Sequence, residues 1–192
     1  MKKKFINRFF KKITLLSSLV LSVAISSSAI AEKFDNKKWL KTCDDKKEVC
    51  IIGIKYITEK NGKEINLVTA FISMGSKTER KMNLVDGGEK TYKLDEKNIS
   101  VPVLSINFPL NVDLKKRPLL QIDKKNILNL NYTHCNVQVG CSTRIAINND
   151  IVELLKIGKE ITLVMGVYAA KDNMVVKLPL KGFTKSYDSL LK

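Results

Sequence analysis

Short runs in which hydrophobic and polar residues alternate follow one another along the chain from residue 39 onward. A period of two is the pattern of a strand that buries one of its faces. The runs predict strands over 39–43, 48–58, 65–71, 99–108, 119–122, 127–135, 141–147, 161–168 and 175–180. Many short strands separated by turns are typical of an antiparallel sandwich or barrel. We therefore expect an all-β fold, an antiparallel β-sandwich-like single domain.

Turn signals and alternation add detail to this picture. Asn61-Gly62 is a strong hairpin signal because both residues adopt positive φ readily, and 123–126 and 171–173 are expected to close two more hairpins. Pro102 cannot donate to a neighbouring strand, so we expect its strand at a sheet edge or a bulge. One alternating set is predicted on a single face of the second strand: Cys50, Ile52, Ile54 and Tyr56. A second set alternates along the third strand: Ile65, Leu67, Thr69 and Phe71.

One or two short helices are expected near the C-terminus. Asp150 to Glu153 has the form of a capping box, and Gly158 supplies the stop of a short helix. Phe183, Tyr187 and Leu190 follow at i, i+4 and i+7, which is the spacing of one apolar helical face.

Residues 75–98 have the weakest pattern, with Gly75, Gly87-Gly88 and mixed charges. We expect a mobile loop here, with weak strands at 82–85 and 91–94. The acidic run 86–89 could bind calcium loosely, but it lacks the regular ligand spacing of an EF-hand, so a flexible loop is the better interpretation.

The first 31 residues are interpreted as a secretory signal peptide. An apolar stretch, 13–25, and the small-residue sequence Ala29-Ile30-Ala31 predict cleavage before Glu32. The apolar stretch is shorter than a bilayer span requires, which argues against an uncleaved anchor. The mature domain would cover 32–192, with no transmembrane segment. Six bases precede the apolar stretch: Lys2, Lys3, Lys4, Arg8, Lys11 and Lys12.

The mature chain is basic. Removing the six leader bases from the 34 Lys and Arg leaves 28 against 19 Asp and Glu, a net charge of +9. An anionic lipid or glycan surface is therefore one candidate partner, and lysine-rich coding bias is the compositional alternative. Nucleic-acid binding is not expected, because the lysines are scattered and the leader predicts export.

Four cysteines in an exported chain predict disulfides. Cys43 with Cys50 and Cys135 with Cys141 is the favoured pairing, because each pair flanks a predicted turn. Structural zinc is the alternative, but zinc ligands usually stand two to four residues apart, a closer spacing than either pair has. No Cys-x-x-Cys redox motif is present.

Several stretches in a fixed order carry a family resemblance. They are Phe108 to Leu114, Cys135 to Cys141, Leu155 to Lys159 and Leu178 to Phe183 with Tyr187, preceded by Trp39, Cys43 and Cys50. Together they resemble the invasion-associated locus B family of exported bacterial proteins. The resemblance implies an all-β sandwich-like domain in the periplasm or exported beyond it, and an association with host-cell invasion in pathogenic members. The family has no agreed catalytic residues, so the resemblance assigns none.

The residues themselves suggest no enzyme chemistry, no metal site and no cofactor. His134, the one histidine, adjoins Cys135 on a predicted strand, where neighbours point to opposite faces, so a Cys–His dyad is geometrically poor. No Gly-x-Ser-x-Gly elbow is present. We expect a non-enzymatic envelope or secreted module that binds another macromolecule. The alternatives are a periplasmic folding or stress factor and, less favoured, an enzyme whose site is assembled from dispersed polar residues.

Overall fold

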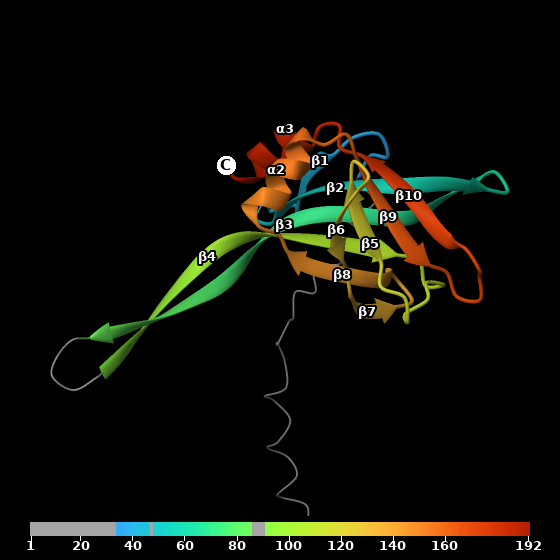
Figure 1. Ribbon diagram of the computed structural model, residues 1–192. Helices are drawn as coiled ribbons and strands as arrows, with labels where there is room; N and C mark the ends of the chain where they lie inside the picture. The colour runs from blue at the N-terminus through green and yellow to red at the C-terminus, as the bar shows by residue number, and fades with distance from the viewer. Residues whose placement is uncertain (1–33, 47, 86–90) are drawn as a thin grey trace, which may run out of the picture.

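The computed structural model describes residues 34–46, 48–85 and 91–192, and these form two antiparallel sheets with two short helices (Figure 1). The larger sheet has the order β1 Leu40–Cys43, β2 Cys50–Lys60, β3 Lys63–Val85, β4 Thr91–Phe108, β8 Gly140–Ala146 and β7 Tyr132–Asn136. The smaller sheet has the order β10 Asn173–Pro179, β9 Glu160–Gly166, β5 Leu119–Ile122 and β6 Lys125–Asn129. The helices are α2 Asn149–Ile157 and α3 Phe183–Leu190. The expected all-β, sandwich-like class is confirmed.

The main core contains apolar residues from both sheets. Ile52 and Ile54 of β2 are fully buried there, on the face that alternation predicts. β3 contributes its other set of alternate residues: Val68, Ala70 and Ile72. Phe71, from the set that the sequence pattern singled out, packs on the opposite face of the sheet against Phe34 and Ile51. Both faces of β3 carry apolar residues, so alternation alone did not identify its core face.

The hairpin at Asn61-Gly62 forms as predicted, with φ of 54° and 71°. The hairpin after β5 also forms, but the single strand expected over 127–135 is two strands, β6 and β7, in different sheets. Between them Leu130 is buried in the core, and its N–H donates to the Pro118 carbonyl at 2.8 Å. The chain crosses between the two sheets at this point.

The stretch expected to be a mobile loop, 75–98, is largely strand. Beyond Ser73 on β3 and before Val103 on β4, each strand has the other as its partner, from Met74↔Pro102 to Val85↔Thr91. Figure 1 shows this two-stranded ribbon projecting from the sandwich. The weak strands predicted at its far end are confirmed, and the acidic run 86–89 lies outside the described residues.

Pro102 lies where β4 changes from an inner strand to part of this ribbon. β4 pairs with both β3 and β8 over 103–107, so the expected edge position does not hold for that part of the strand, whereas Pro102 itself lies just beyond the pairing with β8. Pairing with β8 ends at Val103↔Ala146, and the Pro102 carbonyl then accepts the N–H of Ile147 at 3.0 Å. Pro102 is thus the first residue of β4 beyond the segment paired with β8, so its lack of a backbone N–H removes no hydrogen bond to β8.

Helix α2 begins two residues earlier than the predicted capping box. Asn148 is the N-cap, and its side chain accepts the N–H of Ile151 at 3.0 Å, while Asp150 lies in the first turn. The helix ends at Gly158 as expected, but with φ of −71°. Glycine is needed there for space, since a Cβ would lie 2.8 Å from the Leu154 carbonyl oxygen.

Helix α3 forms the predicted apolar face and closes one end of the core. Phe183 meets Trp39 edge to face at 5.0 Å and stacks on Tyr187 at 5.7 Å. The Trp39 indole N–H donates to the Pro179 carbonyl at 3.1 Å, and the Ser186 hydroxyl donates to the Trp39 carbonyl at 3.0 Å. The last helix therefore holds the first strand of the sheet in place.

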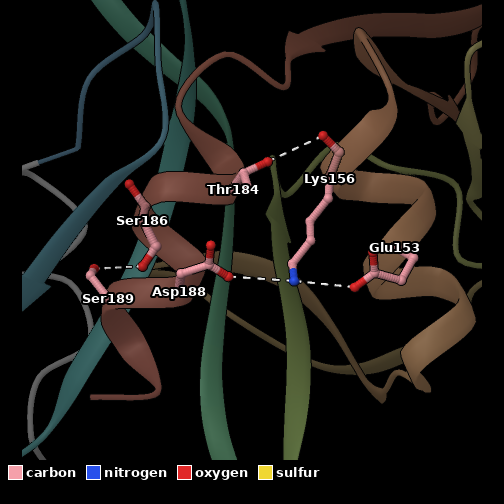
Figure 2. Close-up of polar contacts among 6 residues, drawn as sticks. All are labelled: Glu153, Lys156, Thr184, Ser186, Asp188 and Ser189. Atoms are coloured by element: carbon pink, nitrogen blue, oxygen red, sulfur yellow. Dashed lines mark hydrogen bonds and ion pairs between the residues drawn. The ribbon is translucent and has the colours of Figure 1, made fainter.

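A polar cluster joins the two helices (Figure 2). Lys156 of α2 lies between Glu153 at 3.1 Å and Asp188 of α3 at 3.4 Å, and Thr184 donates to the Lys156 carbonyl at 3.2 Å. The hydrogen bond to Glu153, followed by the contact with Asp188, raises the pKa of Lys156. The ammonium also lies over the Tyr187 ring, 5.4 Å from its centre. The contacts of Lys156 with Asp188, Thr184 and Tyr187 fasten α2 to α3, so we assign the cluster a structural role.

Candidate functional site

A groove opens at the end of β4, beside the turn that joins β7 to β8. Its volume is about 430 Å³. Three segments that are distant in the sequence line it: Asn66, Leu67, Thr69, Asn107, Phe108, Pro109, Leu110, Val137, Gln138, Val139 and Gly140. A hollow of this size accommodates a small ligand or a few side chains of a bound chain.

The β7–β8 turn forms one wall of the groove and is held by a disulfide and by side-chain hydrogen bonds. Cys135 and Cys141 lie directly opposite each other in the register and form a disulfide, with their Cα atoms 4.0 Å apart. The Asn136 side chain accepts the N–H groups of Gln138 and Val139 at 3.0 and 2.9 Å. This network gives the wall a fixed shape.

Gly140 allows that wall to lie directly on the end of β4. Its φ is +82°, a left-handed conformation that residues with a Cβ rarely adopt. A Cβ at this position would also overlap the carbonyl oxygen of Phe108. Glycine is therefore required for both conformation and close approach.

The lining combines neutral polar groups with apolar ones. Asn66 donates to the Thr69 hydroxyl at 2.8 Å, and the Ser142 hydroxyl donates to the Asn107 side-chain oxygen at 2.7 Å, so the strand side chains are already oriented. Leu110 and Val137 at the rim are 52% and 86% exposed. No acid, base, histidine or cysteine is among the lining residues of this groove. The arrangement suits contact with a neutral or apolar segment better than acid–base catalysis.

Behind the groove, Tyr132 packs edge to face on Phe108 at 5.6 Å. Burial, with a smaller contribution from the negative charge of Asp113, raises the pKa of Tyr132 from 10.0 to about 12. Its buried hydroxyl has no hydrogen-bond partner among the described residues. The phenol is therefore held neutral and contributes packing rather than acid–base chemistry.

The structure pairs the cysteines in the way the sequence favours, Cys43 with Cys50 and Cys135 with Cys141. His134 is exposed on β7, with its Nδ1 3.3 Å from the Thr133 hydroxyl. The neighbouring Cys135 is in a disulfide, so this histidine has no thiol beside it to activate. Over the described ranges, no group of three or more His, Cys, Asp or Glu is placed to hold a metal ion.

Sequence reasoning singled out two of the lining segments, Phe108 to Leu114 through the family resemblance and Cys135 to Cys141, but it did not predict that they line a groove. The segment Cys135 to Cys141 stood out because its cysteines flank a turn. Asn66, Thr69 and Asn107 carry no motif, and their one signal is polar side chains within strands that are otherwise apolar. That signal does not indicate that β3 and β4 place these side chains beside the disulfide-bonded β7–β8 turn.

These features define a two-sheet β-sandwich protein with a disulfide at each edge of its larger sheet. The sequence profile described as Invasion associated locus B (IalB) protein matches residues 39–191, and the chain belongs to this family. The resemblance seen in the sequence is therefore confirmed.

One solved structure shows the same fold. The crystal structure of invasion associated protein b from Bartonella henselae matches with a TM-score of 0.55 at 20% sequence identity, covering 80% of this chain and 91% of that one. No curated protein matches the chain in a sequence search. No helix among the described residues is long and apolar enough to cross a membrane.

Proposed function

We propose that this protein is a non-enzymatic binding module, exported to the cell envelope or beyond it, whose groove holds a segment of another macromolecule. The observation that carries the proposal is the groove itself: oriented amide and hydroxyl groups, an apolar rim at Leu110 and Val137, and a lining without titratable side chains. Family membership supports a link between this binding and host-cell interaction, since the neighbouring Bartonella henselae protein is itself called invasion associated.

Export is the first part of the proposal to test. Two disulfides are typical of chains that fold in oxidising compartments. Intact-mass measurement of protein recovered from the periplasm or the medium should give a chain that begins at Glu32. A chain that still carries residues 1–31, or accumulation in the cytoplasm, would contradict this part.

Binding at the groove can be tested with a photo-crosslinking residue placed at Val137. The matched control is the same residue at Ile157, which is 78% exposed on α2 and is not among the residues that line the groove. We expect a discrete adduct at Val137 with envelope or host-membrane fractions and none at Ile157. Adduct formation should fall when Leu110 is changed to Asp, because a charge at the rim opposes apolar contact. Equal labelling at the two positions would contradict groove binding.

A folding or stress factor is the second candidate, and the exposed apolar rim is the observation that favours it. Such a protein would give many adducts at Val137, chiefly with unfolded clients, and would suppress aggregation of a reduced test protein. A single adduct with a folded partner would instead favour the binding module.

A further inference from the structure

Two tight turns lie side by side at one end of the sandwich, one between β4 and β5 and the other between β9 and β10 (Figure 1). The Asp113 N–H donates to the Gly166 carbonyl at 2.9 Å, and the Tyr168 N–H donates to the Asn111 carbonyl at 2.8 Å. These bonds cross-link the two loops, so they present one continuous surface.

Each turn carries a large apolar side chain at its tip. The turns Asp113–Lys116 and Val167–Ala170 are each closed by a hydrogen bond between their end residues, at 3.1 and 3.2 Å. Leu114 and Tyr168 occupy the first central position of these turns and are 59% and 76% exposed. Turn tips normally carry Gly, Pro, Asn, Asp or Ser. Two apolar tips on adjoining turns therefore suggest a surface that meets an apolar partner.

The same two turns are rich in positive charge. Exposed bases follow each apolar tip: Lys115, Lys116, Arg117 and Lys171. Two acids lie among them, Asp113 and Asp172. The Asp113 carboxylate accepts the N–H of Lys115 at 3.0 Å, which fixes the shape of its turn. The surface as a whole remains net positive.

We propose that this turn pair, 113–117 with 167–172, docks the protein on an anionic lipid bilayer. Leu114 and the Tyr168 ring enter the interfacial layer, where amphipathic aromatic side chains are favoured, and the bases meet lipid phosphates. A soluble polyanion such as a glycan would use the bases but would gain nothing from the apolar tips, which is why the geometry favours lipid. The inference extends beyond the groove and does not depend on it.

Vesicle co-sedimentation of the processed protein tests the apolar tips. We expect binding to vesicles of equal parts phosphatidylethanolamine and phosphatidylglycerol, and none to phosphatidylcholine vesicles. Leu114→Ser with Tyr168→Ser should lower the partition coefficient about tenfold. Ile157→Ser with Leu191→Ser, which are 78% and 57% exposed elsewhere, should leave it unchanged.

The bases are tested by Lys115→Gln, Arg117→Gln and Lys171→Gln together. Each base near an anionic surface is worth about a fivefold factor in binding, so we expect a loss of about a hundredfold. The charge-matched control removes three exposed lysines near the C-terminus: Lys181, Lys185 and Lys192. All variants should keep the wild-type unfolding midpoint, because the altered side chains are exposed.

Three outcomes would overturn the proposal. One is the absence of co-sedimentation with the anionic vesicles. Another is equal loss in the two charge variants, which would show diffuse attraction. The third is loss in the Lys115/Arg117/Lys171 variant with none in the Leu114/Tyr168 variant, which would identify a site for soluble polyanions. Photo-crosslinking at Val137 reports on the groove separately, so failure of either idea is distinguishable from failure of the other.

Discussion

At each edge of the larger sheet, a disulfide joins the two strands of a hairpin. The two hairpins have a similar backbone arrangement, but they pack against different residues. Cys43 lies opposite Cys50 where β1 meets β2, and Cys135 lies opposite Cys141 where β7 meets β8, with Cα–Cα distances of 4.0 Å in both. Short edge strands are easily lost or mispaired, and a disulfide to the one neighbouring strand opposes both.

The surroundings of the two hairpins differ. Just before β1, Trp39 is buried against Phe183, so this edge is closed by α3 and joined to the core. The β7–β8 turn instead lies on Phe108 through Gly140 and leaves Val137 in solvent beside the groove. The same kind of disulfide therefore lies at a closed edge of the sheet in the β1–β2 hairpin and in a wall of the groove in the β7–β8 hairpin. The neighbouring residues, not the disulfide, distinguish the two roles.

The closed edge should give the largest effect on stability. Trp39→Ala removes a fully buried indole and its bond to the Pro179 carbonyl, so we expect a loss of about 3–5 kcal/mol in the free energy of unfolding. Urea denaturation measures the loss, with Tyr168→Ala as the exposed aromatic control. Crosslinking at Val137, measured well below the new midpoint, should be unchanged. Loss of that crosslink in a folded variant would mean that the two edges are coupled.

The open edge is tested by Gly140→Ala. We expect a loss of about 3 kcal/mol in the free energy of unfolding, because alanine would have to adopt a left-handed φ and its Cβ would overlap the Phe108 carbonyl oxygen. Gly62→Ala is the matched control: its φ is +71°, but a Cβ there meets nothing within 4 Å, so about 1–2 kcal/mol is expected. Gly140→Ala should also weaken groove binding, while Gly62→Ala should not. Equal costs for the two variants would show that the close approach to Phe108 is unimportant.

Removing either disulfide should lower the free energy of unfolding by somewhat less than Gly140→Ala does. Each closes a short loop, with sequence separations of 7 and 6, and the chain-entropy relation gives about 2–2.5 kcal/mol for each. Replacing each pair by serine tests the comparison directly by denaturation. Binding should survive in both variants below their midpoints. Loss of binding with unchanged stability in Cys135→Ser/Cys141→Ser would point to a redox or metal role for that pair.

The smallest effect concerns Tyr132 behind the open edge. Its pKa rises from 10.0 to about 12 on folding, so between these values the unfolded chain loses the proton first and stability falls as pH rises. Tyr132→Phe should flatten that alkaline loss, and at neutral pH it should change stability by no more than about 1 kcal/mol, since the hydroxyl has no partner among the described residues. The difference between wild type and variant isolates this residue, because lysines titrate in both. Tyr187→Phe is the control at the closed edge, because burial also raises the pKa of Tyr187. An unchanged alkaline slope in Tyr132→Phe would contradict the raised pKa.

Most strands and turns could be predicted because their causes are local. The hairpin at Asn61-Gly62, the end of α2 at Gly158 and the apolar face of α3 all formed where period and turn chemistry indicated. The hairpin before β10 also formed, but its connection is 167–172 rather than 171–173. The ribbon over 75–98 was mistaken for a loop because its sequence shows no apolar alternation, and the side chains at 76–78 and 96–98 are exposed. The N-cap was misplaced because Asn148 and Asp150 are both good caps, and the contact of Asn148 with Ile151 decides between them.

The strand-rich class, the family and the cysteine pairing could be inferred from the chain alone, because each rests on neighbouring residues or on a fixed order of motifs. The core face of β3, the crossing between sheets at Leu130 and the assembly of the groove became visible only in three dimensions. The same holds for the turn pair, in which Leu114 and Tyr168 lie on adjoining loops. These features depend on contacts between residues far apart in the sequence, such as Leu130 with Pro118 and Asp113 with Gly166, and no local period encodes which distant segments will meet.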